Sequence, residues 1–137
     1  MKRILIAHDG SKSSEKALKK GLELAEKFGS AVTVLSVIPD VYLAELMEMD
    51  RTRIIKSLSD EAQKMMEEIK AMPGKVKLKT VIKRGEPAGE ILKAAEKIRA
   101  DMIVTGSHGR HGAQKFLLGS ISSKIVDHSE CSVLVVK

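Results

Sequence analysis

The sequence predicts an α/β fold, a Rossmann-like three-layer sandwich built on a five-stranded parallel sheet. Short apolar runs alternate with stretches of helical periodicity along the chain. Several of these runs are almost continuously apolar, which is typical of parallel strands that are buried on both faces. Because crossover connections are right-handed, few topologies remain, and we expect the strand order 3-2-1-4-5. The chain has 137 residues, and we expect 1–137 to form a single domain.

The first two expected strands flank a helix. Residues 3–8, RILIAH, form a compact apolar run, and residues 31–38, AVTVLSVI, form a β-branched run that ends at Pro39. Between them, apolar residues recur at helical spacing as far as Phe28, and Gly29 stands where a helix would end. This order predicts a strand–helix–strand unit.

A second helix is expected to end before Pro73-Gly74. Its apolar stripe consists of Ile54, Leu58, Ala62, Met65 and Ile69. Residues 41–50, VYLAELMEMD, either extend this helix or form a separate loop, and the sequence leaves both alternatives open.

The alternation continues with two further strands around a helix. Residues 75–83, KVKLKTVIK, alternate polar and apolar side chains, as a half-exposed strand does. Pro87 stands near the first position of an expected helix over 86–98. Residues 101–106, DMIVTG, form the fourth expected strand.

A glycine-rich connection then leads to the last helix and strand. Residues 120–129, SISSKIVDHS, predict a short helix with Ile121, Ile125 and Val126 facing inward. Residues 131–137, CSVLVVK, predict the fifth strand. In the expected order this strand lies at the sheet edge, where an exposed apolar strand favours pairing with another chain.

Composition and charge exclude several classes of function. The net charge is +6, but Lys and Arg alternate with Glu along most of the chain, and aromatic residues make up only 2%. Both features argue against nucleic-acid binding, which uses a basic stripe and aromatic stacking platforms. The apolar run near the N-terminus is too short for a signal peptide, and no stretch reaches transmembrane length. We therefore expect a cytoplasmic protein with no membrane partner.

Two polar, glycine-bearing loops should meet where the winding of the sheet reverses. Residues 8–14, HDGSKSS, follow the first strand, and Gly106 begins the connection after the fourth strand. Ligands of such sheets bind beyond the carboxyl ends of the two central strands. Gly106 and Gly109 would let backbone amides approach a ligand, and Ser120 is a candidate N-cap for the following helix. The amides and the dipole at that helix start favour a phosphate.

Motifs of other phosphate and hydrolase sites are absent from the sequence. It contains no G-x-x-x-x-G-K-[ST] P-loop and no G-x-S-x-G nucleophile motif. The first loop reads His8-Asp9-Gly10-Ser11, so it lacks the second histidine of the H-x-G-H pair that a nucleotidyl transferase would use. No residue is placed as a strong general base, and we assign no catalytic residue.

The sequence resembles the ATP-binding branch of the universal stress protein family. Gly106, Gly109 and the Gly119-Ser120 pair, separated by two and nine residues, are similar to the ATP-binding motif of that family. The likeness extends to RILIAHDGS, RGEPAGEIL, DMIVTGSHGR and SVLVVK, and it is weakest over 41–53. The resemblance implies that the chain binds ATP, or AMP or ADP, together with Mg²⁺.

The resemblance also implies roles for individual residues. Ala7 and Val37 would line the adenine side, and Asp9 would lie near the nucleotide and near a Mg²⁺ ion held mainly through the phosphates. Arg110 would add positive charge beside the phosphates. The expected nucleotide-binding residues are Ala7, Asp9, Val37, Gly106, His108, Gly109, Arg110, Gly119, Ser120, Ile121 and Ser122.

The resemblance further implies a homodimer in which the last strand runs antiparallel to its symmetry mate. The expected interface residues are Val133, Leu134, Val135 and Val136. We expect a dimeric stress-response or signalling module that binds ATP with slow or no hydrolysis and contacts a further protein. Two alternatives stay open: a true ATPase or phosphotransferase that uses the same site, and a dimerisation module that binds no nucleotide.

Overall fold

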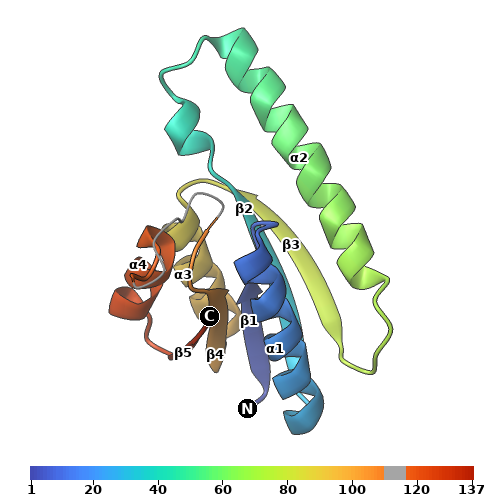
Figure 1. The fold of residues 1–137 in the computed structure, drawn as a ribbon. Coiled ribbons are helices and arrows are strands. Elements are labelled where there is room, and N and C mark those ends of the chain that lie inside the picture. Colours follow the sequence, from blue (N-terminus) through green and yellow to red (C-terminus); the bar gives the residue numbers. More distant parts are fainter. Residues whose placement is uncertain (110–116) are drawn as a thin grey trace.

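The chain folds around a five-stranded parallel sheet in the order β3-β2-β1-β4-β5 (Figure 1). The computed structural model describes residues 1–109 and 117–137. The strands are β1 (Arg3–Ala7), β2 (Ala31–Ile38), β3 (Leu78–Arg84), β4 (Met102–Gly106) and β5 (Ser132–Val136). All neighbouring strands are parallel, and Ile4 of β1 lies between Val32 of β2 and Met102 of β4. The predicted fold class and strand order are confirmed.

Helices cover both faces of this sheet (Figure 1). They are α1 (Lys12–Phe28), the short 3-10 helix η1 (Asp40–Leu43), α2 (Glu48–Lys70), α3 (Pro87–Ile98) and α4 (Ser120–His128). Residues of α1 and α2 share one core with the sheet, and residues of α3 and α4 share the other. In the described part of the chain, no helix combines the length and the apolar character needed to cross a membrane.

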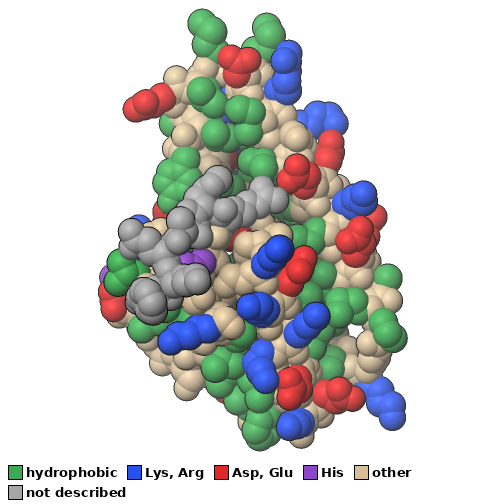
Figure 2. All heavy atoms as spheres, in the orientation of Figure 1, with side chains coloured by type: hydrophobic (Ala, Val, Ile, Leu, Met, Phe, Trp, Pro, Cys, Tyr) green, Lys and Arg blue, Asp and Glu red, His purple; other side chains and the backbone are tan. Residues whose placement is uncertain are grey.

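Acidic and basic side chains are mixed over the face that carries α1. Figure 2 shows lysine and arginine side chains beside aspartate and glutamate side chains across this face. The ion pair between Lys20 and Glu23, with Nζ and Oε2 3.2 Å apart, is one such neighbouring pair. Alternating charges of this kind are typical of solvated helix faces.

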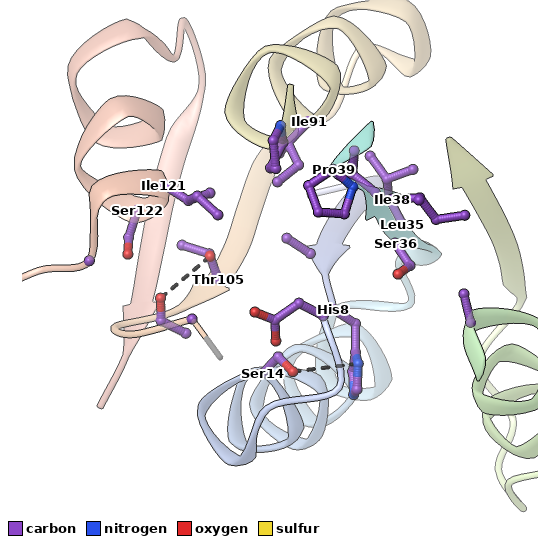
Figure 3. Close-up of a pocket in the computed structure, with 18 of the residues that line it drawn as sticks. His8, Ser14, Leu35, Ser36, Ile38, Pro39, Ile91, Thr105, Ile121 and Ser122 are labelled. Atoms are coloured by element: carbon purple, nitrogen blue, oxygen red, sulfur yellow. Dashed lines mark hydrogen bonds between the residues drawn. The ribbon is translucent and has the colours of Figure 1, made fainter. Parts of the chain in front are cut away.

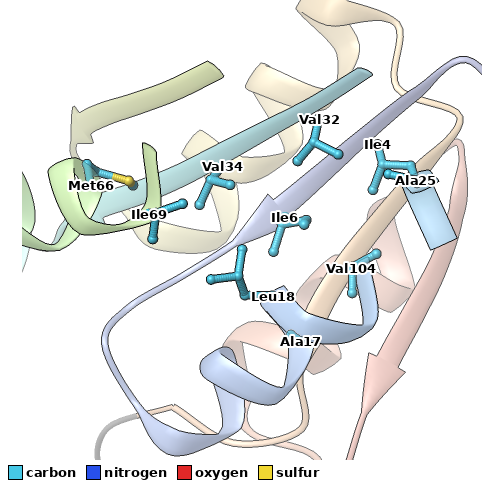
Figure 4. Packing of buried hydrophobic residues seen from close by; sticks show 10 residues of the cluster. All are labelled: Ile4, Ile6, Ala17, Leu18, Ala25, Val32, Val34, Met66, Ile69 and Val104. Atoms are coloured by element: carbon cyan, nitrogen blue, oxygen red, sulfur yellow. The ribbon is translucent and has the colours of Figure 1, made fainter. Parts of the chain in front are cut away.

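The side chains of β1 are divided between the two cores, because successive residues of a strand point to opposite faces. Ile4 and Ile6 pack on the side of α1 and α2 together with Val104 (Figure 4). Leu5 packs on the side of α3 and α4. These three β1 side chains are completely buried, and each such burial stabilises the fold by about 1.5–3 kcal/mol.

Local signals in the sequence determine the ends of α1 and the start of α3. Ser11 Oγ accepts a hydrogen bond from the Ser14 N–H at 3.1 Å and caps the start of α1. At the other end of α1, Gly29 has a left-handed φ of 66°, so the predicted stop is confirmed. The Glu86 carboxylate accepts a hydrogen bond from the Gly89 N–H at 2.6 Å and caps α3.

Two local predictions differ from the structure, and it defines the stretch 41–50, which the sequence had left open. The stretch 41–50 is divided, because η1 occupies its start and α2 begins only at Glu48. The third strand begins at Leu78 instead of residue 75. Val126 was predicted to face inward but is 44% exposed, because its neighbour Ile125 takes the inward position. One residue turns an α-helix by about 100°, and with Ile125 completely buried this rotation directs Val126 toward solvent.

β5 lies at one edge of the sheet and, among the described residues, pairs with β4 alone. The Val136 carbonyl accepts a hydrogen bond from the Ser107 N–H at 3.0 Å, so the backbone groups of Val136 face β4. The direction of these groups alternates along a strand. The N–H and C=O groups of Val133 and Val135 therefore point away from the sheet.

Candidate functional site

A pocket of about 790 Å³ opens beyond the carboxyl ends of β1, β2 and β4. Its walls come from the loop after β1, the end of β2, the connection after β4, the start of α4, and the helices η1, α2 and α3. Figure 3 shows His8 and Ser14 on one side of it, Ile38 and Pro39 on a second, and Ile121 on a third.

Almost the whole set of predicted site residues lines this pocket. Arg110 lies outside the described residues. The predicted residues that line it are Ala7, Asp9, Val37, Gly106, His108, Gly109, Gly119, Ser120, Ile121 and Ser122. Segments almost a hundred residues apart in the chain are therefore brought to one place, because β1 and β4 are neighbours in the sheet.

Asp9 is held by the loop that follows β1. Its Oδ1 accepts a hydrogen bond from the Ser11 N–H at 2.9 Å, which fixes the carboxylate at the pocket wall. Because Ser11 is the N-cap of α1, the Asp9 carboxylate does not cap this helix and can interact with a ligand in the pocket. A Cβ added to Gly109 would lie 3.3 Å from Asp9 Oδ2, so the two loops approach each other closely here.

His8 lines the pocket but was not among the predicted site residues. Its side chain is buried, and Nδ1 accepts a hydrogen bond from the Gly10 N–H at 3.1 Å. The ring proton therefore lies on Nε2. Burial lowers the pKa of His8 more strongly than the nearby carboxylates of Asp9 and Glu15 raise it. A neutral imidazole thus stabilises the loop that carries Asp9. The position of His8 directly after a buried strand was the signal that could have identified it as a pocket residue.

Gly106 is required by packing against α1. A Cβ at this position would lie 2.7 Å from the backbone carbon of Ser13 and 2.8 Å from its carbonyl oxygen. Next to it, the His108 N–H donates a hydrogen bond to Ser13 Oγ at 3.3 Å. The sequence predicted a different reason for this glycine, namely the approach of a ligand. The close contact shows that Gly106 brings the two pocket loops together.

The connection ends at Gly119, which is the N-cap of α4, so the N-cap prediction for Ser120 was wrong by one residue. The Gly119 N–H donates to the Ser107 carbonyl at 2.7 Å, and Ser122 Oγ donates to the same carbonyl at 3.2 Å. Glycine has no side chain to cap the helix. The N–H groups of Ser120, Ile121 and Ser122 have no acceptors within the helix itself, and the helix dipole favours negative charge beside them.

The remaining wall of the pocket is largely apolar. It includes residues from β2, α3, η1 and α2 that sequence reasoning did not assign to a site, because packing between elements far apart in the chain brings them to the pocket. These residues are Leu35, Ile38, Pro39, Tyr42, Leu43, Leu58, Ala62, Met65, Pro87 and Ile91. The pocket therefore joins an apolar side to a helix N-terminus.

A metal ion would have few protein ligands here. Among the described residues, no group of three or more His, Cys, Asp or Glu side chains is arranged to hold a metal ion. Two carboxylate side chains, Asp9 and Glu61, line the pocket. Such a site suits Mg²⁺, which is often bound through one or two carboxylates together with the phosphates of a ligand.

Residues 1–137 match the family model described as the universal stress protein family. The chain belongs to this family. A universal stress protein of Methanocaldococcus jannaschii is 37% identical over 99% of this chain and 82% of its own length. A putative universal stress protein of Staphylococcus saprophyticus is 35% identical over 99% of this chain and 83% of its own length.

Solved universal stress proteins share the fold. The protein UspA from Lactobacillus plantarum has a TM-score of 0.88 at 24% identity, and the match covers 99% of this chain and 97% of UspA. A universal stress protein in complex with cAMP has a TM-score of 0.66 at 19% identity, covering 99% and 96% of the two chains. One from Archaeoglobus fulgidus in complex with dAMP has a TM-score of 0.62 at 20% identity, covering 100% and 98%.

Proposed function

We propose that this universal stress protein binds an adenine nucleotide, ATP with Mg²⁺, and acts as a dimeric stress-response or signalling module with slow or no hydrolysis. One observation carries the proposal: a single pocket joins an apolar wall to the N-terminus of α4. An apolar wall can bury an adenine base, and the N-terminus of a helix can bind a phosphate chain. The complexes of two other family members with cAMP and dAMP support an adenine nucleotide as the class of ligand.

In this proposal the two ends of the pocket bind different parts of the nucleotide. The base lies against Ala7 and Val37, and the phosphates lie against Gly109 and the first turn of α4, with Arg110 adding charge. A hydrogen bond to a charged group contributes about 1.5–3 kcal/mol, and micromolar affinity corresponds to about 8 kcal/mol. A few amide–phosphate hydrogen bonds together with burial of the base are sufficient for that affinity.

Slow hydrolysis is consistent with the groups around the proposed phosphate site. Asp9 is the carboxylate beside Gly109, and one of its oxygens already accepts the Ser11 N–H. His8 uses Nδ1 to accept the Gly10 N–H, so that nitrogen is not available as a general base. These contacts favour Asp9 as a group that positions Mg²⁺.

The first experiment is acid extraction of the purified protein followed by chromatography, with calorimetric titration of the nucleotide-free protein. We expect released ATP, or binding of added Mg-ATP with a micromolar Kd. ADP without ATP would favour the alternative of a true ATPase. Neither released nor bound nucleotide would contradict the proposal and favour a module that works by dimerisation alone.

The proposed homodimer forms through β5. Val133 and Val135 direct backbone N–H and C=O groups outward from the sheet edge, where a second β5 can pair with them. Val135→Pro removes one outward N–H without removing a hydrogen bond to β4. We expect the mass of the assembly to fall by half in sedimentation, and the Val133 amide to lose its protection against hydrogen exchange. Unchanged mass and protection would contradict pairing through this strand; Val135→Thr serves as the control.

A further inference from the structure

The pocket has walls on both faces of the sheet. Ala7 and Val37, the residues proposed for the base, belong to the core that the sheet shares with α3 and α4. His8 and Ser36 belong to the opposite face. The His8 N–H donates to the Leu35 carbonyl at 2.9 Å, so the pairing of β1 with β2 continues to His8 and places it beside Ser36. Side chains alternate between faces along a strand, so both point to the face that α1 and α2 cover.

Two polar groups on this face have no hydrogen bond within the chain. His8 is 5% exposed and Ser36 is 6% exposed. His8 Nδ1 accepts a backbone N–H, but the Nε2–H group of His8 and the hydroxyl of Ser36 have no partner among the described residues. The other buried hydroxyls of the pocket wall each reach a backbone carbonyl, and they are those of Ser14, Thr105 and Ser122.

Both unpaired groups are open to the pocket. His8 and Ser36 line it, and no side-chain nitrogen or oxygen in the described part of the chain is both sealed from solvent and unpaired. Figure 3 shows the His8 ring beside Ser14 of α1 and Ser36 at the end of β2, with α2 (green) to their right. Burying a polar group without a hydrogen bond costs free energy. The two groups therefore need a partner that enters the pocket.

The surroundings determine which chemistry that partner can have. A protonated ring nitrogen only donates, and a serine hydroxyl can also donate, so one oxygen with two lone pairs can accept from both. The nearby carboxylates of Asp9 and Glu15 would repel an anion. None of the described residues that line the pocket is a lysine or an arginine. A neutral oxygen acceptor is therefore favoured on this face.

The same part of the pocket has an apolar lining. Leu58, Ala62 and Met65 line it from α2, and their spacing of four and three residues places them on one face of this helix. Ile38 of β2 lines it as well. A carbon skeleton attached to the oxygen acceptor can therefore be buried between β2 and α2.

We propose that the α2 side of the pocket binds a small neutral carbonyl compound. Its oxygen accepts hydrogen bonds from the Nε2–H group of His8 and from the Ser36 hydroxyl, and its carbon skeleton packs against Ala62 and Met65. This ligand is separate from the proposed nucleotide, which occupies the side of α3 and α4. The inference rests on the pocket and does not require the proposed function.

NMR titration of the nucleotide-free protein with cyclopentanone tests this site. Methylenecyclopentane is the control probe, because a CH₂ group replaces the oxygen in a ring of the same size. We expect saturable binding of cyclopentanone, nuclear Overhauser contacts from the probe to the methyl groups of Ala62 and Met65, and a downfield shift of the His8 Nε2–H proton. Methylenecyclopentane is expected to bind several-fold more weakly and to leave that proton unshifted.

Ser36→Ala is expected to weaken cyclopentanone binding by about fivefold, the effect of one hydrogen bond. Thr105→Val is the matched control, because the Thr105 hydroxyl already reaches the Gly106 carbonyl, and its affinity should equal that of the parent. Equal affinity in Ser36→Ala and the parent, equal binding of the two probes, or no saturable binding, as when water alone fills the site, would overturn the inference. A protein that fails to bind ATP but passes these tests would contradict only the proposed function.

Discussion

Ser120→Pro is expected to weaken ATP binding by roughly tenfold to a hundredfold, the equivalent of losing one hydrogen bond of about 1.5–3 kcal/mol to a charged group. Ser120 is the first residue of α4, and its N–H has no acceptor within the helix. Proline is favoured at this position, because its missing N–H is not needed there and its φ suits a helix. Gly119 has φ −62° and ψ 159°, a conformation that a residue before proline adopts readily.

The matched control is Ser120→Ala, which removes the hydroxyl and keeps the N–H. Calorimetric titration with Mg-ATP gives the two affinities, and thermal unfolding without nucleotide checks that both variants keep the stability of the parent. The proposal for the phosphate site predicts a clear loss for proline and a small change for alanine. Equal affinities in the proline variant and the parent would show that this amide does not bind the nucleotide.

Gly106→Ala is expected to lower the free energy of unfolding by about 1–3 kcal/mol, the range for an overpacked interior. The added Cβ would lie 2.7 Å from the backbone carbon of Ser13 in the first turn of α1. Backbone atoms cannot rotate away as a side chain can, so β4 and α1 must separate. The Ser13–His108 hydrogen bond spans the same two segments, so we also expect weaker nucleotide binding in this variant.

Urea unfolding followed by circular dichroism measures this loss. Gly109→Ala is the control, because among the described residues its Cβ would meet only the Asp9 carboxylate, at 3.3 Å, and a side chain can shift. Its stability should stay close to that of the parent. If Gly106→Ala unfolds at the same urea concentration as the parent, the contact with Ser13 does not determine the choice of glycine.

Most of the fold could be predicted from the sequence, because its signals are local and agree with one another. The apolar runs of β1 and β4 are continuous, and Gly29 and Pro87 mark helix ends whose backbone requirements few other residues meet. The stretch 41–50 could not be predicted in the same way. Helical and loop signals are mixed in it, and its conformation depends on where η1 and α2 lie relative to the sheet.

The lining of the pocket could be predicted where glycine spacing and topology agree, but not where packing between distant elements determines which residues line it. Gly109, Gly119 and Ser120 all line the pocket. The contribution of α2 to the apolar wall was missed, since no sequence pattern places Leu58 over the end of β2. The contact between Gly106 and Ser13 was missed for the same reason, because it joins residues far apart in the chain.

The adjacency of β1 and β4 has a consequence for the synthesis of the protein. The loop after β1 leaves the ribosome early, but its partners in the pocket, from β4 to the start of α4, follow only after residue 102. A nascent chain that ends after α3 thus contains Asp9 and Val37 but lacks the pocket wall formed by the segment from β4 to the start of α4. Retention on immobilised ATP should therefore begin only in ribosome-bound chains whose first turn of α4 has emerged from the exit tunnel.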